Sequence, residues 1–346
     1  MTVSVGVIGV GRWGPNLLRN FHNRRTSVVT LVAEREERRR AQLAELYPDV
    51  RFVADAELVL HADEVDAVAI ATPTRTHYAL VREALLNDKH VLVEKPLTDQ
   101  LGAALELGKL AEEHGRIVLV GHVFLYNPGV ERVKWYLDEG TLGVPFYISM
   151  VRTNLGPIRK DVNAAWDLAA HDISIANYWL GSAPLAVSAT GGTWINSGIA
   201  DTVFATLEYP GNVMVSLESS WLNPRKVRDI TIVAEHKMVT LDDTNPEEPI
   251  RIYDKGVVDE TTRDEVVDTL GQFRSLVHEG EIVIPRVSLG EPLRAECDDF
   301  LHCIETSDEP RAGYDAAMEV VRTLDAIDRS MGLGGTRVPL LTPVLV

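Results

Sequence analysis

The sequence predicts an α/β protein with two domains. The first is a doubly wound parallel sheet, and the second is an α+β domain with a mostly antiparallel sheet. Fully apolar runs alternate with helical segments as far as residue 120, and a glycine-rich turn follows the first run, which is typical of a parallel sheet covered by helices. From residue 185 onward, strand-like segments follow one another across short turns, which favours antiparallel pairing.

The apolar runs of the first domain are the expected strands of the parallel sheet: residues 3–10, 28–33, 50–53, 67–71, 91–93 and 117–120. Segments of helical composition or spacing lie between them. These expected helices cover residues 17–21, 34–46, the stretch before residue 64, 77–86 and 103–114.

The second domain begins where this alternation stops, near residue 122. We expect helices at 130–137, 163–181, 292–306 and 314–331, and strands at 146–153, 185–190, 202–209, 213–221, 230–234 and 237–241. Residues 244–249 and 254–264 are expected to be polar loops. The predicted domains are therefore residues 1–121 and 122–346.

Composition bounds the function. A chain of 346 residues is long enough for two cores, and 45% hydrophobic residues with a mean hydropathy of -0.02 describe an ordinary globular protein. A net charge of -17 argues against nucleic acid or an anionic membrane as a partner.

Cysteine usage and the chain start point to the cytoplasm. Cys297 and Cys303 match no common metal pattern or redox pair, so we expect reduced thiols and no metal. The sequence enters a strand at once and has no apolar run of about 18 residues, so we expect neither a signal peptide nor a membrane span.

The turn after the first strand carries Gly9, Gly11 and Gly14 in the pattern Gly-x-Gly-x-x-Gly. The first glycine permits a tight turn, the second lets the backbone approach a pyrophosphate, and the third lets the helix pack closely. The phosphates would lie at the helix N-terminus. Because strand, turn and helix follow in this order, the pattern predicts a dinucleotide site rather than a turn that binds nothing.

Glu34 follows the second strand, where a carboxylate can accept hydrogen bonds from the adenosine ribose. A carboxylate would repel a 2′-phosphate, so the sequence favours NAD. NADP remains open, because Arg35 and the arginines at 38–40 could hold that phosphate, although such a run is often a solvated face.

Two later strands also end in candidate ligand-binding residues, as expected at the carboxyl ends of a parallel sheet. Thr72, Pro73 and Thr74 form the first loop, and His77 begins the helix after it.

Glu94, Lys95 and Pro96 follow the strand at 91–93. The proline restricts the backbone around Lys95, which makes the lysine a fixed cation at the edge of the sheet. The structural alternative is a lysine that extends from the strand end into solvent.

In the predicted helix at 163–181, Asp167 and His171 are four residues apart and share one face. The carboxylate can orient the imidazole and favour its protonated form. Asp172 points elsewhere, so we expect it to be solvated or to contact the backbone. A histidine satisfied by its surroundings, with no catalytic role, is the alternative.

Together these motifs resemble the glucose-fructose oxidoreductase, inositol dehydrogenase and rhizopine catabolism family. The resemblance covers nearly the whole chain. Its motifs are Gly9-Val10-Gly11-Arg12-Trp13-Gly14, Thr72-Pro73-Thr74 with His77, Glu94-Lys95-Pro96, and Asp167-x-x-x-His171.

The resemblance implies an N-terminal Rossmann domain and a C-terminal domain with an open sheet that forms homodimers or homotetramers. It implies a cis peptide before Pro96, with Lys95 contacting substrate and nicotinamide ribose, and His171 as the acid/base. The expected cofactor-binding residues are Gly9, Gly11, Arg12, Trp13, Gly14, Glu34, Thr72, Pro73, Thr74, His77, Glu94, Lys95 and Pro96.

Within the family, residues 121–128 and 166–174 are most similar to nucleotide-sugar 3-dehydrogenases, which act on UDP-N-acetylglucosamine or its uronic acid. The implied reaction moves a hydride between nicotinamide and a sugar ring carbon, most simply C3, while His171 takes the hydroxyl proton, Lys95 stabilises the oxygen and Asp167 orients the imidazole. The expected substrate-binding residues are Lys95, Tyr126, Asn127, Arg159, Lys160, Asn163, Asp167 and His171.

Three other functions remain open. The chain could oxidise inositol or a free sugar, or reduce a 3-keto-deoxysugar. It could also bind NAD(H) as a regulator without turnover, but the presence of Lys95, Asp167 and His171 together argues against that.

Overall fold

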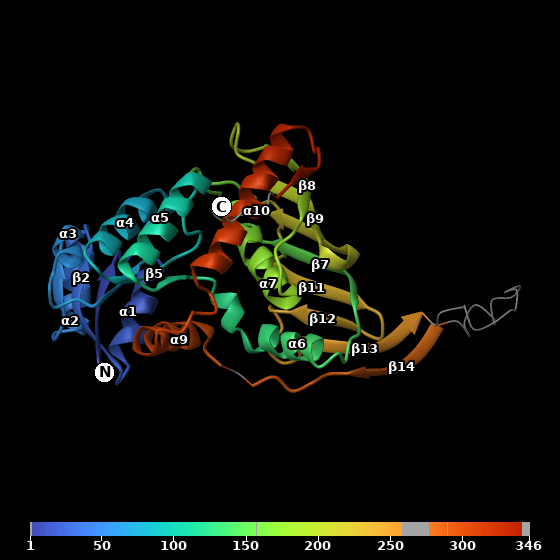
Figure 1. The fold of residues 1–346 in the computed structure, drawn as a ribbon, viewed down its shortest axis with the longest axis horizontal. Helices are drawn as coiled ribbons and strands as arrows, with labels where there is room; N and C mark the ends of the chain where they lie inside the picture. The colour runs from blue at the N-terminus through green and yellow to red at the C-terminus, as the bar shows by residue number, and fades with distance from the viewer. Residues whose placement is uncertain (1, 157, 258–276, 289, 341–346) are drawn as a thin grey trace, which may run out of the picture. The chain divides into compact units, whose positions relative to one another are not determined.

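The computed structural model of the chain describes residues 2–156, 158–257, 277–288 and 290–340 (Figure 1). The chain divides into two compact units, one of residues 1–127 and 290–325 and the other of residues 128–289 and 326–346. Each unit has its own sheet. None of the described helices is long and apolar enough to cross a membrane.

The first unit is built on a six-stranded sheet in the order β3-β2-β1-β4-β5-β6. All of its neighbouring strands are parallel, as predicted. The strands are β1 (Val3–Ile8), β2 (Ser27–Ala33), β3 (Arg51–Val53), β4 (Ala67–Ile70), β5 (His90–Val93) and β6 (Val118–Val120). The order in which strands are added to the sheet reverses between β1 and β4, and ligands bind at this position in open α/β sheets.

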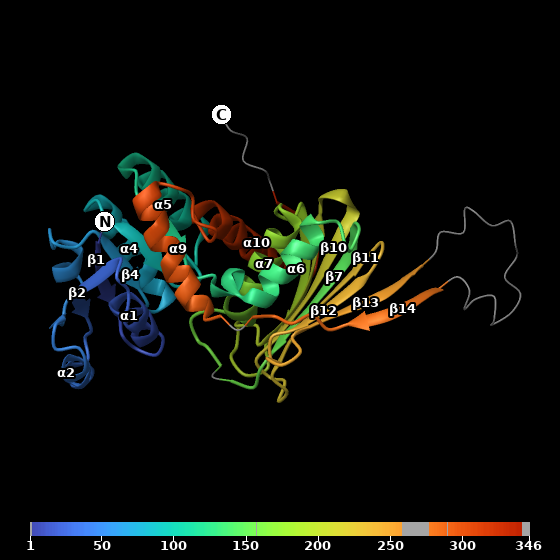
Figure 2. The same ribbon diagram turned by 90° about the horizontal axis from the view of Figure 1, so that it is seen from below.

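The helices of the first unit cover this sheet. They are α1 (Gly14–His22), α2 (Glu37–Leu46), α3 (Glu57–Leu60), α4 (His77–Leu86), α5 (Leu101–His114) and α9 (Pro292–Thr306), with the short turns η1 (Thr74–Thr76) and η2 (Val123–Tyr126). Helices α4 and α5 lie side by side, as do α1 and α9 (Figures 1 and 2).

Helix α9 departs from the predicted domain division, which placed it in the second domain. Its Phe300 ring packs edge-on against Phe21 of α1 at 6.2 Å between ring centroids. Its Asp298 accepts a hydrogen bond of 2.5 Å from Arg24. These contacts make residues 290–325 part of the first unit, although they lie far from it in sequence.

The second unit contains a nine-stranded sheet in the order β14-β13-β12-β11-β7-β10-β9-β8-β15. All of its pairs are antiparallel except β7 and β10, which run parallel. The strands are β7 (Pro145–Thr153), β8 (Ala186–Gly192), β9 (Thr202–Tyr209), β10 (Val213–Ser220), β11 (Val227–Ala234), β12 (Met238–Asp242), β13 (Ile250–Val257), β14 (Val277–Val283) and β15 (Val338–Pro339).

Helices α6 (Pro128–Asp138) and α7 (Ala170–Leu180) lie against one face of this sheet (Figure 2). Helix α10 (Tyr314–Gly332) begins in the first unit and ends in the second, where its Ser330 hydroxyl accepts a hydrogen bond of 2.8 Å from the Ala189 amide of β8.

The prediction missed three of the described strands, β13, β14 and β15. Residues 250–257 form β13, so the expected polar loop at 254–264 is wrong at its start, and residues 258–264 lie outside the described part of the chain. β13 pairs with β12 and β14. The polar residues within it obscured the apolar alternation of Ile250 and Ile252, which are buried.

Candidate active site

The glycine turn of the first unit is shaped by two contacts that exclude side chains. Gly9 has a φ of +84°, and a Cβ on it would lie 2.7 Å from the Thr72 side chain. A Cβ on Gly14 would lie 1.9 Å from the Gly9 carbonyl oxygen. At Gly11, a Cβ would meet only Arg39 Nη1, at 3.6 Å. Packing therefore requires glycine at positions 9 and 14, while Gly11 leaves open space above the turn.

The N-terminus of α1 is free to hold an anion. Trp13 at the N-cap forms no side-chain cap, and the first turn contains Pro15 and no acidic residue. The first amides of a helix have no partner within the helix, and its dipole favours negative charge there. The turn and the helix start therefore fit the pyrophosphate of a dinucleotide.

Glu34 is held beside this turn. One carboxylate oxygen accepts a hydrogen bond from the Val10 amide at 3.1 Å, and the other accepts one from the Glu36 amide at 3.0 Å. Arg39 donates to the Val10 carbonyl at 3.2 Å, and Arg40 donates to the Glu34 carbonyl at 2.7 Å. Two of the arginines that could hold a 2′-phosphate are therefore bonded to the backbone, and the Glu34 carboxylate lies beside the glycine turn.

His77 joins the loops that follow β4 and β5. Its ring is 1% exposed, with Nδ1 2.9 Å from the Pro96 carbonyl oxygen and Nε2 2.9 Å from the Thr72 carbonyl oxygen. The peptide between Lys95 and Pro96 is cis, which confirms the implication of the family resemblance. His77 therefore positions the backbone of the predicted cofactor loops.

Glu94 lies directly before this cis peptide, close to Gly121, whose Cβ would be 2.9 Å from the Glu94 carboxylate. Burial raises the pKa of Glu94 to about 7, against the opposing effects of the Lys95 cation and of a hydrogen bond from Trp13. Glu296 of α9 is fully buried, and burial followed by the charge of Glu94 raises its pKa well above the usual range. Two carboxyl groups thus lie under the strand end that carries Lys95.

In the second unit, Asp167 is held by two donors. Arg159 Nη1 donates to one carboxylate oxygen at 3.1 Å, and Trp221 Nε1 donates to the other at 3.0 Å. Asp167 lies in a π-helical turn, Ala165–Ala169, and His171 lies in the first turn of α7. The predicted helix is present, but its first part is a widened π-helical turn of the kind often found at functional sites.

Asp172 contradicts the expectation of a solvated side chain. It is 2% exposed and accepts hydrogen bonds from Arg152 Nε at 2.9 Å and Nη2 at 2.6 Å. Arg152 is 5% exposed and lies on the buried face of β7. This buried ion pair attaches the turn that carries His171 to the sheet. The sequence contained a signal for this buried cation. Arg152 is at the same alternating positions of the strand as Ile148 and Met150, whose side chains point inward.

The remaining predicted substrate-binding residues differ in their contacts and burial. Asn163 caps the π turn by accepting from the Ala165 and Trp166 amides, and it donates to Asp328 at 2.7 Å. Lys160 is exposed and Asn127 is half-buried.

Tyr126 is 3% exposed, and its hydroxyl donates to Asp299 of α9 at 2.6 Å. Burial, together with the Asp299 charge, raises its pKa. These are the contacts of a core residue of the first unit.

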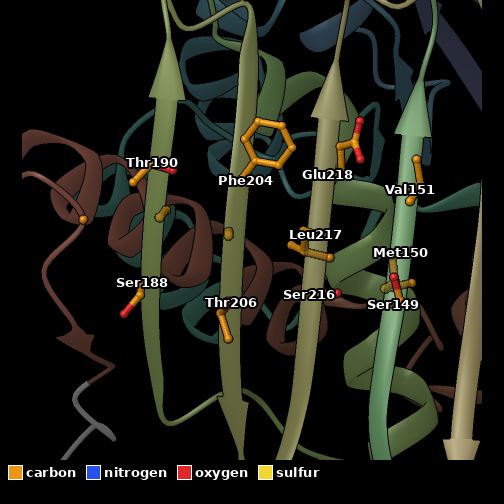
Figure 3. Close-up of a pocket in the computed structure, with 13 residues that line it drawn as sticks. Ser149, Met150, Val151, Ser188, Thr190, Phe204, Thr206, Ser216, Leu217 and Glu218 are labelled. Carbon is orange, nitrogen blue, oxygen red and sulfur yellow. The ribbon is translucent and has the colours of Figure 1, made fainter.

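The face of the second sheet opposite α6 and α7 has a shallow depression of about 410 Å³. Thr190, Phe204, Glu218 and Val151 form a row along its floor on four neighbouring strands (Figure 3). Phe204 is 51% exposed.

Among the described residues, no group of three or more His, Cys, Asp or Glu side chains could hold a metal ion.

Two family models match this chain. The model described as "Oxidoreductase family, NAD-binding Rossmann fold" matches residues 3–122, and the "GFO/IDH/MocA C-terminal domain" matches residues 130–240. The first confirms the predicted cofactor fold, which binds NAD.

Relatives of known activity cover much of the chain. UDP-N-acetylglucosamine 3-dehydrogenase of Acidithiobacillus ferrooxidans is 27% identical over 306 residues, which is 86% of this chain and 88% of the relative. Its solved structure superposes with a TM-score of 0.80 at 24% identity, over 96% of this chain and 98% of the other. Inositol 2-dehydrogenase 2 of Saccharopolyspora erythraea is 32% identical over 63% of this chain and 66% of the relative.

Gly14→Ala should weaken NAD binding, because the new Cβ would overlap the Gly9 carbonyl and push α1 away from the turn. Overpacking of this kind costs about 1–3 kcal/mol, so we expect the Kd for NAD, measured by calorimetry, to rise about 5- to 150-fold. Gly102→Ala in α5 is the control, since a Cβ there meets nothing within 4 Å. If both variants bind NAD with equal affinity, the close contact between Gly14 and the Gly9 carbonyl is not needed for NAD binding.

Glu94→Gln should change how stability depends on pH. Because the pKa of Glu94 rises from 4.5 to about 7 on folding, folding takes up a proton between these values, and the free energy of unfolding falls as pH rises through this window. Thermal melts of the variant at pH 5 and pH 8 should therefore differ less than those of the wild type. The control is Glu112→Gln, because Glu112 is exposed. It should keep the wild-type difference between the melting temperatures at pH 5 and pH 8.

Proposed function

The chain belongs to the GFO/IDH/MocA family of NAD-binding oxidoreductases, and we propose that it transfers a hydride between NAD and C3 of a nucleotide-sugar such as UDP-N-acetylglucosamine. The observation that carries the substrate class is the UDP-N-acetylglucosamine 3-dehydrogenase, whose similarity extends over 86% of this chain. The inositol dehydrogenase of higher identity matches only 63%.

The proposed reaction assigns each predicted catalytic residue one task. In the oxidative direction, the substrate CH–OH group loses a hydride and a proton and becomes a ketone. NAD, when bound, accepts the hydride at C4 of its nicotinamide ring. His171 takes the hydroxyl proton, and Lys95 stabilises the negative charge that develops on the oxygen.

Asp167 acts in this proposal as a positioning residue. Its two oxygens connect Arg159 and Trp221, from separate segments of the second unit, to the turn before His171. Together with the Arg152–Asp172 pair, these contacts support a fixed orientation of the first turn of α7. A general base must be held within hydrogen-bond reach of its proton, so such bracing supports the acid/base role.

A dehydrogenase of inositol or free sugars is the second candidate, favoured by the 32% identity of the inositol 2-dehydrogenase. Incubating the protein with NAD and UDP-N-acetylglucosamine, its uronic acid, free N-acetylglucosamine or myo-inositol distinguishes the two by NADH absorbance at equal concentrations. We expect the UDP-sugars to give the highest kcat/KM. A higher value with inositol would replace the proposal with the second candidate.

His171→Ala should lower kcat by about 10²- to 10⁴-fold, the usual contribution of general acid–base catalysis, while the Kd for NAD stays close to the wild-type value. Lys95→Ala should also lower kcat strongly, because the charge on the substrate oxygen loses its cation, and it should weaken NAD binding as well if Lys95 contacts the nicotinamide ribose. Exposed residues of the same types provide controls: His302→Ala and Lys109→Ala should keep full activity. Nearly full activity of His171→Ala would refute its assignment as the base.

We also propose that the sheet face in Figure 3 forms a homodimer with a second copy of the chain, as the family resemblance implies. The face supports this because Phe204, Met214 and Tyr147 each expose about half of their surface on neighbouring strands. Exposed apolar patches of this kind mark interaction sites.

Phe204→Glu should therefore convert the oligomer to monomers, since it places a second carboxylate directly across the strand pair from Glu218. Light scattering after size exclusion measures the mass. The control is Leu105→Glu on α5 of the first unit, where the wild-type residue is 41% exposed. An unchanged mass for Phe204→Glu would exclude this face as the interface.

A further inference from the structure

Trp194 is a large aromatic residue left in solvent on a well-braced loop. It is 68% exposed, and the neighbouring Ile195 is 59% exposed. The loop connects β8 and β9, and the fully buried Asp201 accepts hydrogen bonds from the Trp194 amide at 2.6 Å and the Ile195 amide at 2.8 Å. The backbone under the exposed indole is therefore fixed.

The indole is held as well as exposed. A Cβ placed on Gly192 would lie 2.1–2.7 Å from three atoms of the six-membered ring of Trp194. The ring thus packs against the strand end at a position where only glycine fits, and the rest of its surface meets solvent. An aromatic ring already held in place loses little conformational entropy when a flat ligand stacks on it.

The Trp194 loop is connected to the predicted catalytic segment of the same unit. Asn196 Nδ2 donates to the Arg159 carbonyl at 3.2 Å, and the Ala164 amide donates to the Ala200 carbonyl at 2.9 Å. Trp194 is two residues before Asn196 in the chain. Since successive Cα atoms are about 3.8 Å apart, the backbone of Trp194 lies close to that of Asn196. The loop that carries the exposed indole is therefore bonded to the segment that carries Arg159 and leads to Asp167.

One exposed cation at this place could contact an anion. Arg159 is engaged by Asp161 at 2.6 Å and by Asp167 at 3.1 Å. The next residue, Lys160, is exposed. Lys160 follows Arg159, whose carbonyl is bonded to the Trp194 loop, so an exposed cation and an exposed aromatic residue lie on two segments that are in contact. These are the two groups that a nucleoside diphosphate needs, a cation for phosphate and a stacking surface for the base.

We propose that Trp194 is the stacking surface for the base of a nucleoside diphosphate sugar and that Lys160 binds its diphosphate, which makes this loop the element that selects nucleotide-sugars over free sugars or inositol. The assignment deepens the proposed function and rests on it for the identity of the sugar. A free sugar has no base to occupy the indole, so it would leave Trp194 in water.

The test measures the Kd for UDP by calorimetry with the intact protein saturated with NADH, and the KM for UDP-N-acetylglucosamine. Trp194→Ala should weaken UDP binding about 5- to 150-fold, as expected for loss of one base–aromatic stack. Trp194→Phe should retain most of the affinity. Gly192→Ala should weaken binding in the same direction, since it displaces the indole without removing it.

The control is Trp135→Ala in α6 of the same unit. Trp135 is 48% exposed and its ring lies beside Arg132, so this variant removes an exposed indole next to a cation at another place. It should leave UDP affinity unchanged. All variants are checked by thermal melts and by molecular mass.

Three outcomes separate the possibilities. If Trp194→Ala binds UDP as the wild type does while UDP-sugar oxidation continues, the stacking assignment is wrong and the proposed function stands. If Trp194→Ala changes the oligomer mass and not the UDP affinity, Trp194 is an interface residue and the assignment is also wrong. If UDP binding depends on Trp194 but no UDP-sugar is oxidised, the base site stands and the proposed reaction fails.

Discussion

The buried ion pair between Arg152 and Asp172 is the constraint on which the proposed chemistry of the second unit depends. Both side chains are nearly inaccessible to water. Desolvating two charges costs several kcal/mol, and removal of one partner leaves the other buried and uncompensated. The pair is therefore poor evidence for stability. Its structural effect is to join the centre of the sheet, at β7, to the helical turn that carries the proposed base.

The same principle of bracing by polar groups operates in the first unit. His77 contacts the carbonyls of Thr72 and Pro96, and Glu34 accepts hydrogen bonds from the amides of Val10 and Glu36. In both cases a side chain that the motif suggests for ligand contact also satisfies backbone groups of the loop itself. A residue in such a motif can thus be needed for the shape of the site as much as for contact with the cofactor.

Sequence reasoning succeeded where the physical cause is local. The apolar runs predicted the parallel strands, and the spacing of Gly9 and Gly14 predicted a close turn whose contacts are now visible. It failed where the cause is a distant partner. Asp167 meets Trp221 from the end of β10, and Phe300 meets Phe21 across most of the chain. The π turn at 165–169 was also hidden, because its residues have ordinary helical composition.

The discontinuity of the first unit has a practical consequence for dissecting the protein. Its sheet comes from residues before 128, yet α9 and the first part of α10 return to it only after strands β7 to β14 of the second sheet. A fragment cut at residue 127 would uncover Phe21 and leave the Tyr126 hydroxyl without Asp299. The dinucleotide fold is therefore completed only by late-synthesised chain, and splitting this enzyme at its apparent boundary would yield an unfinished half.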